Sequence, residues 1–345
     1  MMVRSIWITT LFLLCLVGCP LLGAHVSEAN PHYLAELQDS LRGHRLSGTF
    51  AEVKDFGSNP GGIKMYSYVP SPKPTFSPLV VVLHGCTQTA RDIAATGGWN
   101  ELADRFGFIV LFPEQVSRSD YKSNPMQGFN WFKEEHIMRG TGEAESIHQM
   151  IDRMKTDHSI DPKRVFVTGL SAGGAMTAVM CCAYPDVFAG GAVMAGIPYR
   201  AAGSNDAFMV MFQGKDLTPA QWAKMATDSF PGYSGQYPRM SIFHGTKDTT
   251  VTPVNMRELV DQFTALQNTD QTPDLSEKVK GFPHKMYKNT GGNVVVETYE
   301  IIGMPHGIAV DPGTDLDQGG AEGSFAHATG LFSSYYALKF WGVVP

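Results

Sequence analysis

The sequence lacks the features that mark several classes of protein. It has only five cysteines in 345 residues, and none of them stands at the Cys-x-x-Cys or Cys/His spacing of a structural zinc site. It also has no internal repeat and no low-complexity linker. These absences exclude a small disulfide scaffold, a collagen-like repeat, a coiled coil and a disordered chain.

Positive charge is also scarce. The chain has 27 basic and 33 acidic residues, which gives a net charge of −6, so we expect no nucleic-acid partner. Its 43% of hydrophobic residues suits one large globular core of roughly 250–300 residues. The 36 glycines and 21 prolines indicate many turns, which favours an α/β or all-β chain over a helical bundle.

The apolar run near the N-terminus is too short to span a bilayer comfortably. Arg4 precedes about a dozen apolar residues between Ile6 and Val17, a pattern typical of a secretory signal peptide. We therefore predict a signal peptide over residues 1–24, a single domain over residues 25–345, and secretion of the mature protein.

A second interpretation of this segment is a lipid anchor. The residues Leu16-Val17-Gly18-Cys19 resemble a bacterial lipoprotein box, so cleavage before Cys19 and acylation of its thiol is the alternative. A lipid on Cys19 is the sole membrane attachment that we expect. The protein would then be anchored to the cell envelope.

Export makes disulfide bonds feasible. Three of the five cysteines, Cys86, Cys181 and Cys182, fall in the predicted domain. Because three is an odd number, at least one thiol is unpaired or bonded to another chain. The sequence leaves the pairing open.

Short apolar runs alternate with helical patterns along the rest of the chain. Runs of this kind are typical of strands buried on both faces of a sheet, and the alternation predicts an α/β fold, with a mostly parallel sheet between helices. The strands are expected at 77–83, 108–112, 164–168, 191–195, 240–243 and 294–302, and the helices at 98–105, 142–157, 172–182 and 253–266. Residues 48–55 and 62–69 predict an antiparallel hairpin, and 199–239 a less regular segment over the top of the sheet.

The most specific motif is Gly169-Leu170-Ser171-Ala172-Gly173, directly after an expected strand and before an expected helix. Gly-x-Ser-x-Gly in this setting is a nucleophile elbow, whose tight turn leaves no room for large neighbours. The turn holds the serine at a helix N-terminus, where developing negative charge is favoured. Ser171 is therefore the predicted nucleophile.

A serine nucleophile needs a base and an orienting acid, and in this fold they follow it in the order acid, then histidine. His306 lies in a small-residue loop after the last expected strand and is the predicted base. His284 and His327 are weaker alternatives, which we expect in a loop and beside a helix. His244 ends a strand close to the acid and is expected to pack or to form hydrogen bonds in the sheet.

Asp248 is the predicted acid, because it lies in the loop after the buried strand at 240–243. A carboxylate there can accept the second ring N–H of the histidine and stabilise the imidazolium. The alternative is a turn or capping aspartate. Asp216 and Asp311 are weaker candidates.

The oxyanion hole is predicted to consist of two backbone N–H groups, those of Cys86 and Ala172. The first follows the early strand and the second follows the nucleophile. Trp131 is a candidate for the acyl pocket, with core packing as its alternative. Glu143 opens a helix, where an acidic residue suits the dipole. The mechanism requires no cofactor and no metal.

Several phrases together resemble the extracellular poly(3-hydroxybutyrate) depolymerase family of esterases, a branch of the α/β-hydrolases. They run in the same order over roughly residues 50–342, and are Leu83-His84-Gly85-Cys86-Thr87-Gln88, Phe129-Asn130-Trp131-Phe132, Gly142-Glu143-Ala144, Gly169–Met176, His244–Val251, Gly303-Met304-Pro305-His306 and the closing helix around Ser333–Gly342. The resemblance implies the triad of Ser171, Asp248 and His306.

The resemblance implies an exported serine esterase that hydrolyses poly(3-hydroxybutyrate)-type polyester or its oligomers. Feruloyl or acetyl-xylan ester hydrolysis is the alternative within the fold, and a non-catalytic surface binding protein is the alternative outside enzymes. Polymer-degrading members usually carry a linker and a binding domain after the catalytic domain, which would end near Pro345, so we also expect amorphous polymer, oligomers or another ester as substrates. The family often has cysteine where Gly128 stands.

Overall fold

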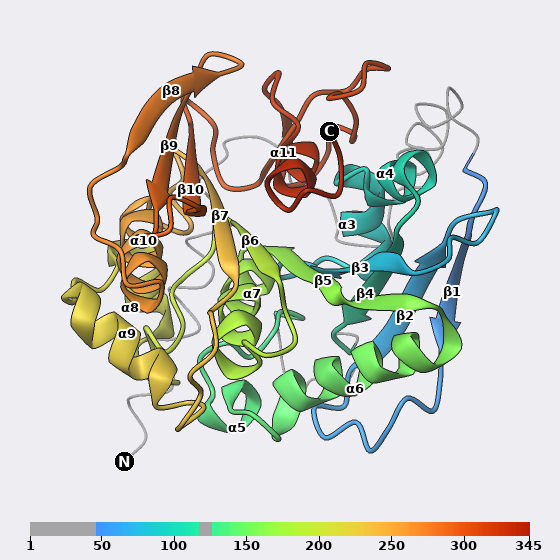
Figure 1. Ribbon diagram of the computed structural model, residues 1–345, viewed down its shortest axis with the longest axis horizontal. Helices are drawn as coiled ribbons and strands as arrows, with labels where there is room; N and C mark the ends of the chain where they lie inside the picture. The colour runs from blue at the N-terminus through green and yellow to red at the C-terminus, as the bar shows by residue number, and fades with distance from the viewer. Residues whose placement is uncertain (1–45, 117–125) are drawn as a thin grey trace, which may run out of the picture. The chain divides into compact units, whose positions relative to one another are not determined.

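In the computed structural model, residues 46–116 and 126–345 are described. Their frame is a ten-stranded sheet in the order β1-β2-β4-β3-β5-β6-β7-β10-β9-β8 (Figure 1). The strands are β1 (Thr49–Val53), β2 (Lys64–Val69), β3 (Ser77–Leu83), β4 (Ile109–Glu114), β5 (Ile160–Leu170), β6 (Gly190–Met194), β7 (Arg239–Gly245), β8 (Leu275–Val279), β9 (Phe282–Lys288) and β10 (Val294–Ile301). The predicted signal peptide and Cys19 lie outside the described residues.

The centre of the sheet is parallel and its two edges are antiparallel. β4, β3, β5, β6, β7 and β10 pair in parallel, whereas β1–β2–β4 and β10–β9–β8 pair antiparallel. Every residue of β3, β4 and β6 is buried, as expected for strands covered on both faces. The predicted hairpin is β1–β2, in which Thr49 pairs with Val69.

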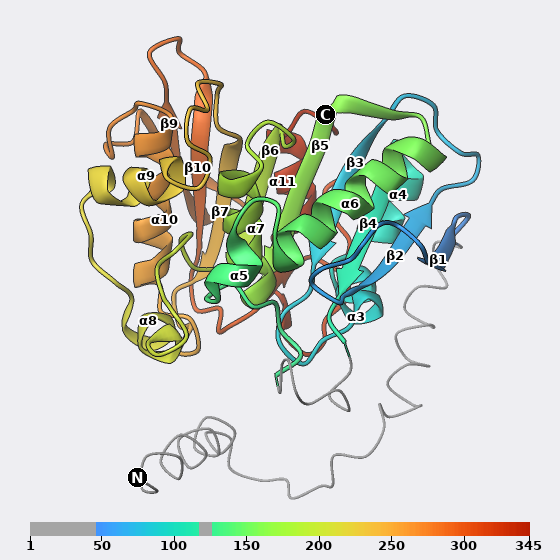
Figure 2. The same ribbon diagram turned by 90° about the horizontal axis from the view of Figure 1, so that it is seen from below.

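Helices cover both faces of this sheet, as predicted. Apolar side chains of α5 (Glu134–Ile137), α6 (Gly142–Asp157), α7 (Ala172–Ala183), α8 (Ala207–Gln213), α9 (Pro219–Thr227) and α10 (Val254–Leu266) form the core of one face. Those of α3 (Ala90–Thr96), α4 (Trp99–Phe106) and α11 (Ser333–Phe340) form the core of the other. Figures 1 and 2 show these two layers.

The segment 199–239 differs from its prediction. It contains two helices, α8 and α9, and α9 packs against α10 rather than over the top of the sheet. Trp222 of α9 is fully buried and its indole N–H donates to Glu258 of α10 at 2.8 Å. The aromatic residues of this segment have no clear helical period, so the sequence pattern did not predict α9.

Two histidines also lie in other elements than we expected. His284 belongs to strand β9 and not to a loop. His327 belongs to strand β12 (Ala326–Ala328), which pairs in parallel with β11 (Ile308–Val310). Within residues 46–116 and 126–345, no helix is long and apolar enough to cross a membrane.

Candidate active site

Ser171 lies between the end of β5 and the start of α7, in the turn predicted for a nucleophile. Its backbone has φ 57° and ψ −118°, an uncommon conformation for a residue with a side chain. The Ser171 amide donates to Met194 O at 2.9 Å, which fixes the turn against strand β6. The side chain is only partly accessible, since the residue is 7% exposed.

The two glycines of the motif allow the turn to approach strand β3. A Cβ atom at Gly169 would lie 2.7 Å from Leu83 O, and one at Gly173 would lie 2.6 Å from His84 O. Such distances are too short for any larger residue. The small residues are therefore required by the close packing of the first turn of α7 on the end of β3.

Asp248 and His306 come together at the end of the parallel strands. The Oδ2 atom of Asp248 lies 2.7 Å from Nδ1 of His306. The Oδ1 atom accepts the backbone N–H groups of Thr250 and Val251, each at 2.9 Å. Three donors thus hold an aspartate whose side chain is fully buried, and a carboxylate in this setting accepts the imidazole N–H.

The two loops that carry this pair are hydrogen-bonded to each other. Thr246 N donates to Ile301 O at 3.0 Å and Lys247 N donates to Met304 O at 3.1 Å. Gly303 N in turn donates to the Thr246 hydroxyl at 2.9 Å. Because β7 and β10 are parallel neighbours, the loops that follow them meet at the carboxyl ends of the strands. The hydrogen bonds between these loops place the histidine beside the aspartate.

His244 contacts the same carboxylate from inside the sheet. Its Nε2 atom lies 2.8 Å from Val251 O and 3.4 Å from Asp248 Oδ2. Burial alone raises the pKa of Asp248, but hydrogen bonds from His244 and His306 outweigh burial and hold that pKa well below its usual range. We expected His244 to pack or to form hydrogen bonds in the sheet, and its hydrogen bond goes to Val251 O in the loop after β7.

Cys86 and Ala172 lie on either side of Gly128. A Cβ atom at Gly128 would clash with the Cys86 sulfur and lie 3.2 Å from the Ala172 Cβ. The loop after β3 and the start of α7 therefore face one another here. Among the described residues, neither the Cys86 nor the Ala172 backbone N–H donates to a backbone carbonyl of a loop or turn, and the Cys86 N–H faces its own sulfur.

Glu143 has a larger part in this region than the sequence indicated. We expected a helix-opening acid, but the residue is 0% exposed. Its carboxylate accepts Asn130 N at 2.8 Å and the side-chain amides of Asn130 and Gln115, each at 2.5 Å. Burial raises the pKa of Glu143 to about 7, against the opposing effect of these hydrogen bonds. The residue anchors the loop that contains Gly128.

Trp131 is mostly buried. It is 5% exposed and belongs to the core on the α6 and α7 face, where it packs edge-to-face on Phe132 at 5.3 Å between ring centroids. Cys86, Cys181 and Cys182 are all free thiols. Cys181 and Cys182 are wholly buried near the C-terminal end of α7, whereas Cys86 lies in the loop after β3.

Within residues 46–116 and 126–345, no hydrogen bond joins the Ser171 hydroxyl to His306, and no group of three or more metal-ligating side chains is present. Catalytic hydrogen bonds are often long before substrate binds. The triad therefore stays a prediction. The structure brings together its acid and its base, Asp248 and His306.

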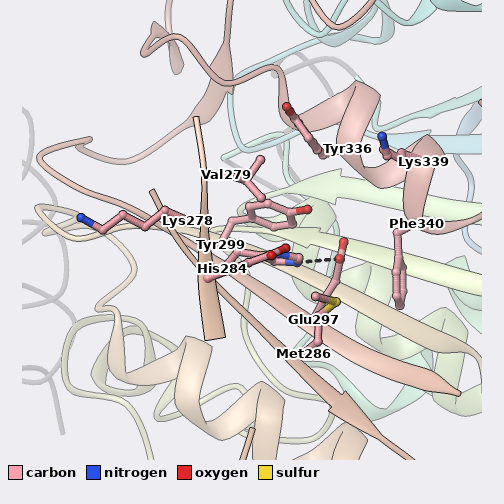
Figure 3. Close-up of a pocket in the computed structure, with 10 residues that line it drawn as sticks. Lys278, Val279, His284, Met286, Glu297, Tyr299, Tyr336, Lys339 and Phe340 are labelled. Atoms are coloured by element: carbon pink, nitrogen blue, oxygen red, sulfur yellow. Dashed lines mark hydrogen bonds and ion pairs between the residues drawn. The ribbon is translucent and has the colours of Figure 1, made fainter. Parts of the chain in front are cut away.

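A pocket of about 530 Å³ lies elsewhere, between β8–β10 and α11 (Figure 3). His284 lies on its wall, with Nε2 at 2.9 Å from Glu297 and Nδ1 at 3.2 Å from Glu277. Its ring stacks on Tyr299 at 4.3 Å. None of the predicted catalytic residues lines this pocket.

Comparisons with known proteins identify the family and the fold. The family model "Esterase PHB depolymerase" matches residues 66–273. The chain is 50% identical over 294 residues to Poly(3-hydroxyalkanoate) depolymerase C of Paucimonas lemoignei, covering 85% of this chain and 70% of that protein. It is 36% identical over 226 residues to Acetylxylan esterase A of Aspergillus oryzae, covering 63% and 71%.

Among solved structures, the acetyl xylan esterase from Aspergillus awamori is similar, with a TM-score of 0.67 and 30% identity over 75% of this chain and 94% of that one. The predicted α/β-hydrolase fold is confirmed. The chain therefore belongs to the PHB depolymerase family of esterases and is a carboxylic ester hydrolase.

Proposed function

We propose that this protein is an exported serine hydrolase that cleaves poly(3-hydroxyalkanoate)-type polyester or its oligomers. The observation that carries the mechanism is the buried 2.7 Å hydrogen bond between Asp248 and His306, at the carboxyl ends of the parallel strands, where Ser171 follows β5. The relative from Paucimonas lemoignei supports the substrate class.

The proton transfers follow from the Asp248–His306 pair. The ionised carboxylate accepts the Nδ1–H of His306, so the lone pair of this neutral imidazole is on Nε2. Nε2 takes the hydroxyl proton of Ser171 as Oγ attacks the ester carbonyl, and then gives that proton to the leaving alcohol. Water, deprotonated by His306, releases the acid from the acyl-enzyme in the second half of the cycle.

The negative charge of each tetrahedral intermediate falls between two backbone donors. The N–H groups of Cys86 and Ala172 bind the oxyanion, and the N-terminus of the twelve-residue helix α7 adds its positive dipole end. Asp248 stabilises the imidazolium that forms at the same time. The groups named here complete the reaction without a cofactor.

The deciding experiment compares the mature protein with its Ser171→Ala variant on two substrates. Wild type is expected to clear an amorphous poly(3-hydroxybutyrate) suspension and to cleave p-nitrophenyl butyrate, with monomers or dimers of 3-hydroxybutyrate identified by mass spectrometry. Ser171→Ala is expected to do neither. Ser276→Ala, on exposed strand β8, is the matched control. Equal, measurable ester hydrolysis by wild type and Ser171→Ala would contradict the triad. Hydrolysis by neither protein would leave the non-catalytic alternative.

The second candidate is hydrolysis of plant cell-wall esters, favoured by the similarity to the acetyl xylan esterase structure from Aspergillus awamori. It predicts acetate release from acetylated xylan, or ferulate release from feruloyl esters, by a protein that leaves the polyester suspension turbid. Both candidate activities use the same catalytic residues. They differ in the acyl and alcohol groups that the substrate site accepts, and we assign Trp131 to this site.

Export is proposed from residues 1–24. Mass spectrometry of the mature N-terminus distinguishes the two forms: an unmodified start near His25 indicates a secreted enzyme, and a diacylglyceryl group on Cys19 indicates an envelope lipoprotein. An intact Met1 in protein from the native host would contradict both.

A further inference from the structure

We infer that His84 is a positioning residue for the oxyanion hole, because its ring N–H holds the peptide unit whose N–H is the Cys86 donor. The inference rests on the proposed function, in which the Cys86 amide binds the oxyanion. It concerns a side chain that does not touch the substrate.

His84 follows strand β3 directly and is wholly enclosed. The residue is 0% exposed and its ring packs against Phe129, with 5.0 Å between centroids. Because the ring is surrounded by core atoms, it has one orientation. Each of its two nitrogens then meets a single, defined partner.

The partners determine which nitrogen carries the proton. Nε2 lies 3.0 Å from the backbone nitrogen of Gln115, and a backbone amide can only donate, so Nε2 accepts. Burial lowers the pKa of His84 to about 4, which keeps the ring neutral. The single ring proton is therefore on Nδ1, which lies 2.8 Å from Gly85 O and donates to it.

The carbonyl of Gly85 and the N–H of Cys86 belong to one peptide group. Since that group is planar and trans, fixing the carbonyl fixes the N–H, which points the opposite way. Gly85 O also accepts Gln88 N at 3.2 Å, and Gly85 N donates to the Gln88 side chain at 2.8 Å. The peptide is thus held at its oxygen and at the preceding nitrogen.

A hydrogen bond to the carbonyl also polarises the amide. Hydrogen bonds in a chain strengthen one another in a low-dielectric interior, so the Nδ1–H of His84 makes the Cys86 N–H a better donor to a negative oxygen. The Gln115 side chain is itself held by Glu143. This chain of contacts explains why a buried histidine stands next to the oxyanion loop.

Two variants separate this role from simple packing. In His84→Asn the side-chain amide nitrogen occupies the place of Nδ1 and still donates to Gly85 O, but the acceptor for Gln115 is lost. In His84→Gln an oxygen at the end of the longer chain can accept from Gln115 N–H, but the donor to Gly85 O is lost. His84→Leu removes both.

We expect kcat to depend on whether residue 84 has a hydrogen-bond donor at the position of Nδ1. We expect His84→Asn to keep kcat for p-nitrophenyl butyrate within about 3-fold of wild type. We expect His84→Gln and His84→Leu to lower kcat by roughly 10–100-fold with little change in KM, which is less than the roughly 10²–10³-fold loss typical of removing a whole oxyanion donor. Affinity for a boronic acid that forms a tetrahedral adduct with Ser171 should fall in parallel.

The reverse order would overturn the inference: full activity in His84→Gln with a large loss in His84→Asn would mean that the bond to Gln115 is what matters. Unchanged kcat in both, with turnover still lost in Ser171→Ala, would also overturn it and leave the proposed function intact. Thermal unfolding of each variant identifies any that fails to fold, and the Asn/Gln pair keeps the test decisive if His84→Leu does.

Discussion

The Nδ1 atom of His306 lies 2.7 Å from Oδ2 of Asp248, although 58 positions separate the two residues in the chain. The contact depends on the parallel pairing of β7 with β10, because that pairing brings the loops after both strands to the same end of the sheet. The first prediction tests this contact directly.

Replacing Asp248 with asparagine keeps the shape of the side chain and removes its charge. We expect kcat for a soluble ester to fall by roughly 10³–10⁴-fold, because an amide can stabilise the wrong imidazole tautomer and cannot stabilise the imidazolium. Steady-state kinetics at pH 8 measure this loss. Activity within a factor of ten of wild type would show that another group orients His306.

The same substitution has a stability signature. The pKa of Asp248 is lower in the folded protein than its ordinary value of 3.8, so its contribution is present above that value and is lost as the pH falls toward the lower, folded pKa. The difference in unfolding free energy between wild type and Asp248→Asn should therefore be large at pH 7 and smaller near pH 3, as urea titrations can show. A difference independent of pH would contradict this.

Glu143→Gln is expected to destabilise the protein and to slow it. Three N–H groups of Asn130 and Gln115 donate to the two carboxylate oxygens, so the new amide NH₂ would face at least one of these donors whichever oxygen it replaces. An unpaired buried donor costs roughly 1–3 kcal/mol. Because the Asn130 loop also carries Gly128, kcat should fall as well. Urea unfolding and ester kinetics test both effects, with Glu52→Gln on exposed β1 as the control. A stability equal to that control would refute the anchoring role.

Gly128→Ala is expected to disturb the oxyanion loop, because the added methyl group would clash with the Cys86 sulfur. We expect kcat to fall by about 10-fold or more, as for other small displacements of catalytic groups. Combining it with Cys86→Ala removes the sulfur and should recover much of the rate. Failure of the double variant to exceed Gly128→Ala would assign the loss to another contact.

His284 is expected to make stability depend on pH without affecting catalysis. Burial alone lowers the pKa of His284, but its hydrogen bonds to Glu297 and Glu277 outweigh burial and raise that pKa above 6.5. Since the folded pKa is raised, the contribution is fully present below about pH 6.5 and is lost as the pH rises through the folded value. Figure 3 shows the bond to Glu297 on the pocket wall.

His284→Gln should therefore lower Tm most at pH 5.5, by about 2–4 °C if roughly 1 kcal/mol is lost, and least at pH 9. Calorimetry across this range measures it, and kcat for p-nitrophenyl butyrate should stay unchanged because no predicted catalytic residue lines that pocket. A loss of Tm in His284→Gln that grows with pH would contradict the prediction.

The sequence by itself determined the scaffold and the position of the turn that holds Ser171, the predicted nucleophile. Nearly continuous apolar runs such as 77–83 predicted β3, because strands buried on both faces consist mostly of apolar residues. The motif around Ser171 predicted the strained turn because only glycine fits at Gly169 and Gly173. These features are local in sequence, so local patterns reveal them.

Only the tertiary structure decided which polar residues share an environment. A buried acid such as Glu143 resembles an ordinary helix-opening acid in sequence, and His84 resembles any histidine at a strand end. Their roles depend on partners far along the chain, Asn130 and Gln115, which the pairing of strands and the packing of α6 bring within hydrogen-bond distance. Such contacts depend on how distant segments pack in three dimensions, so a local sequence pattern does not reveal them.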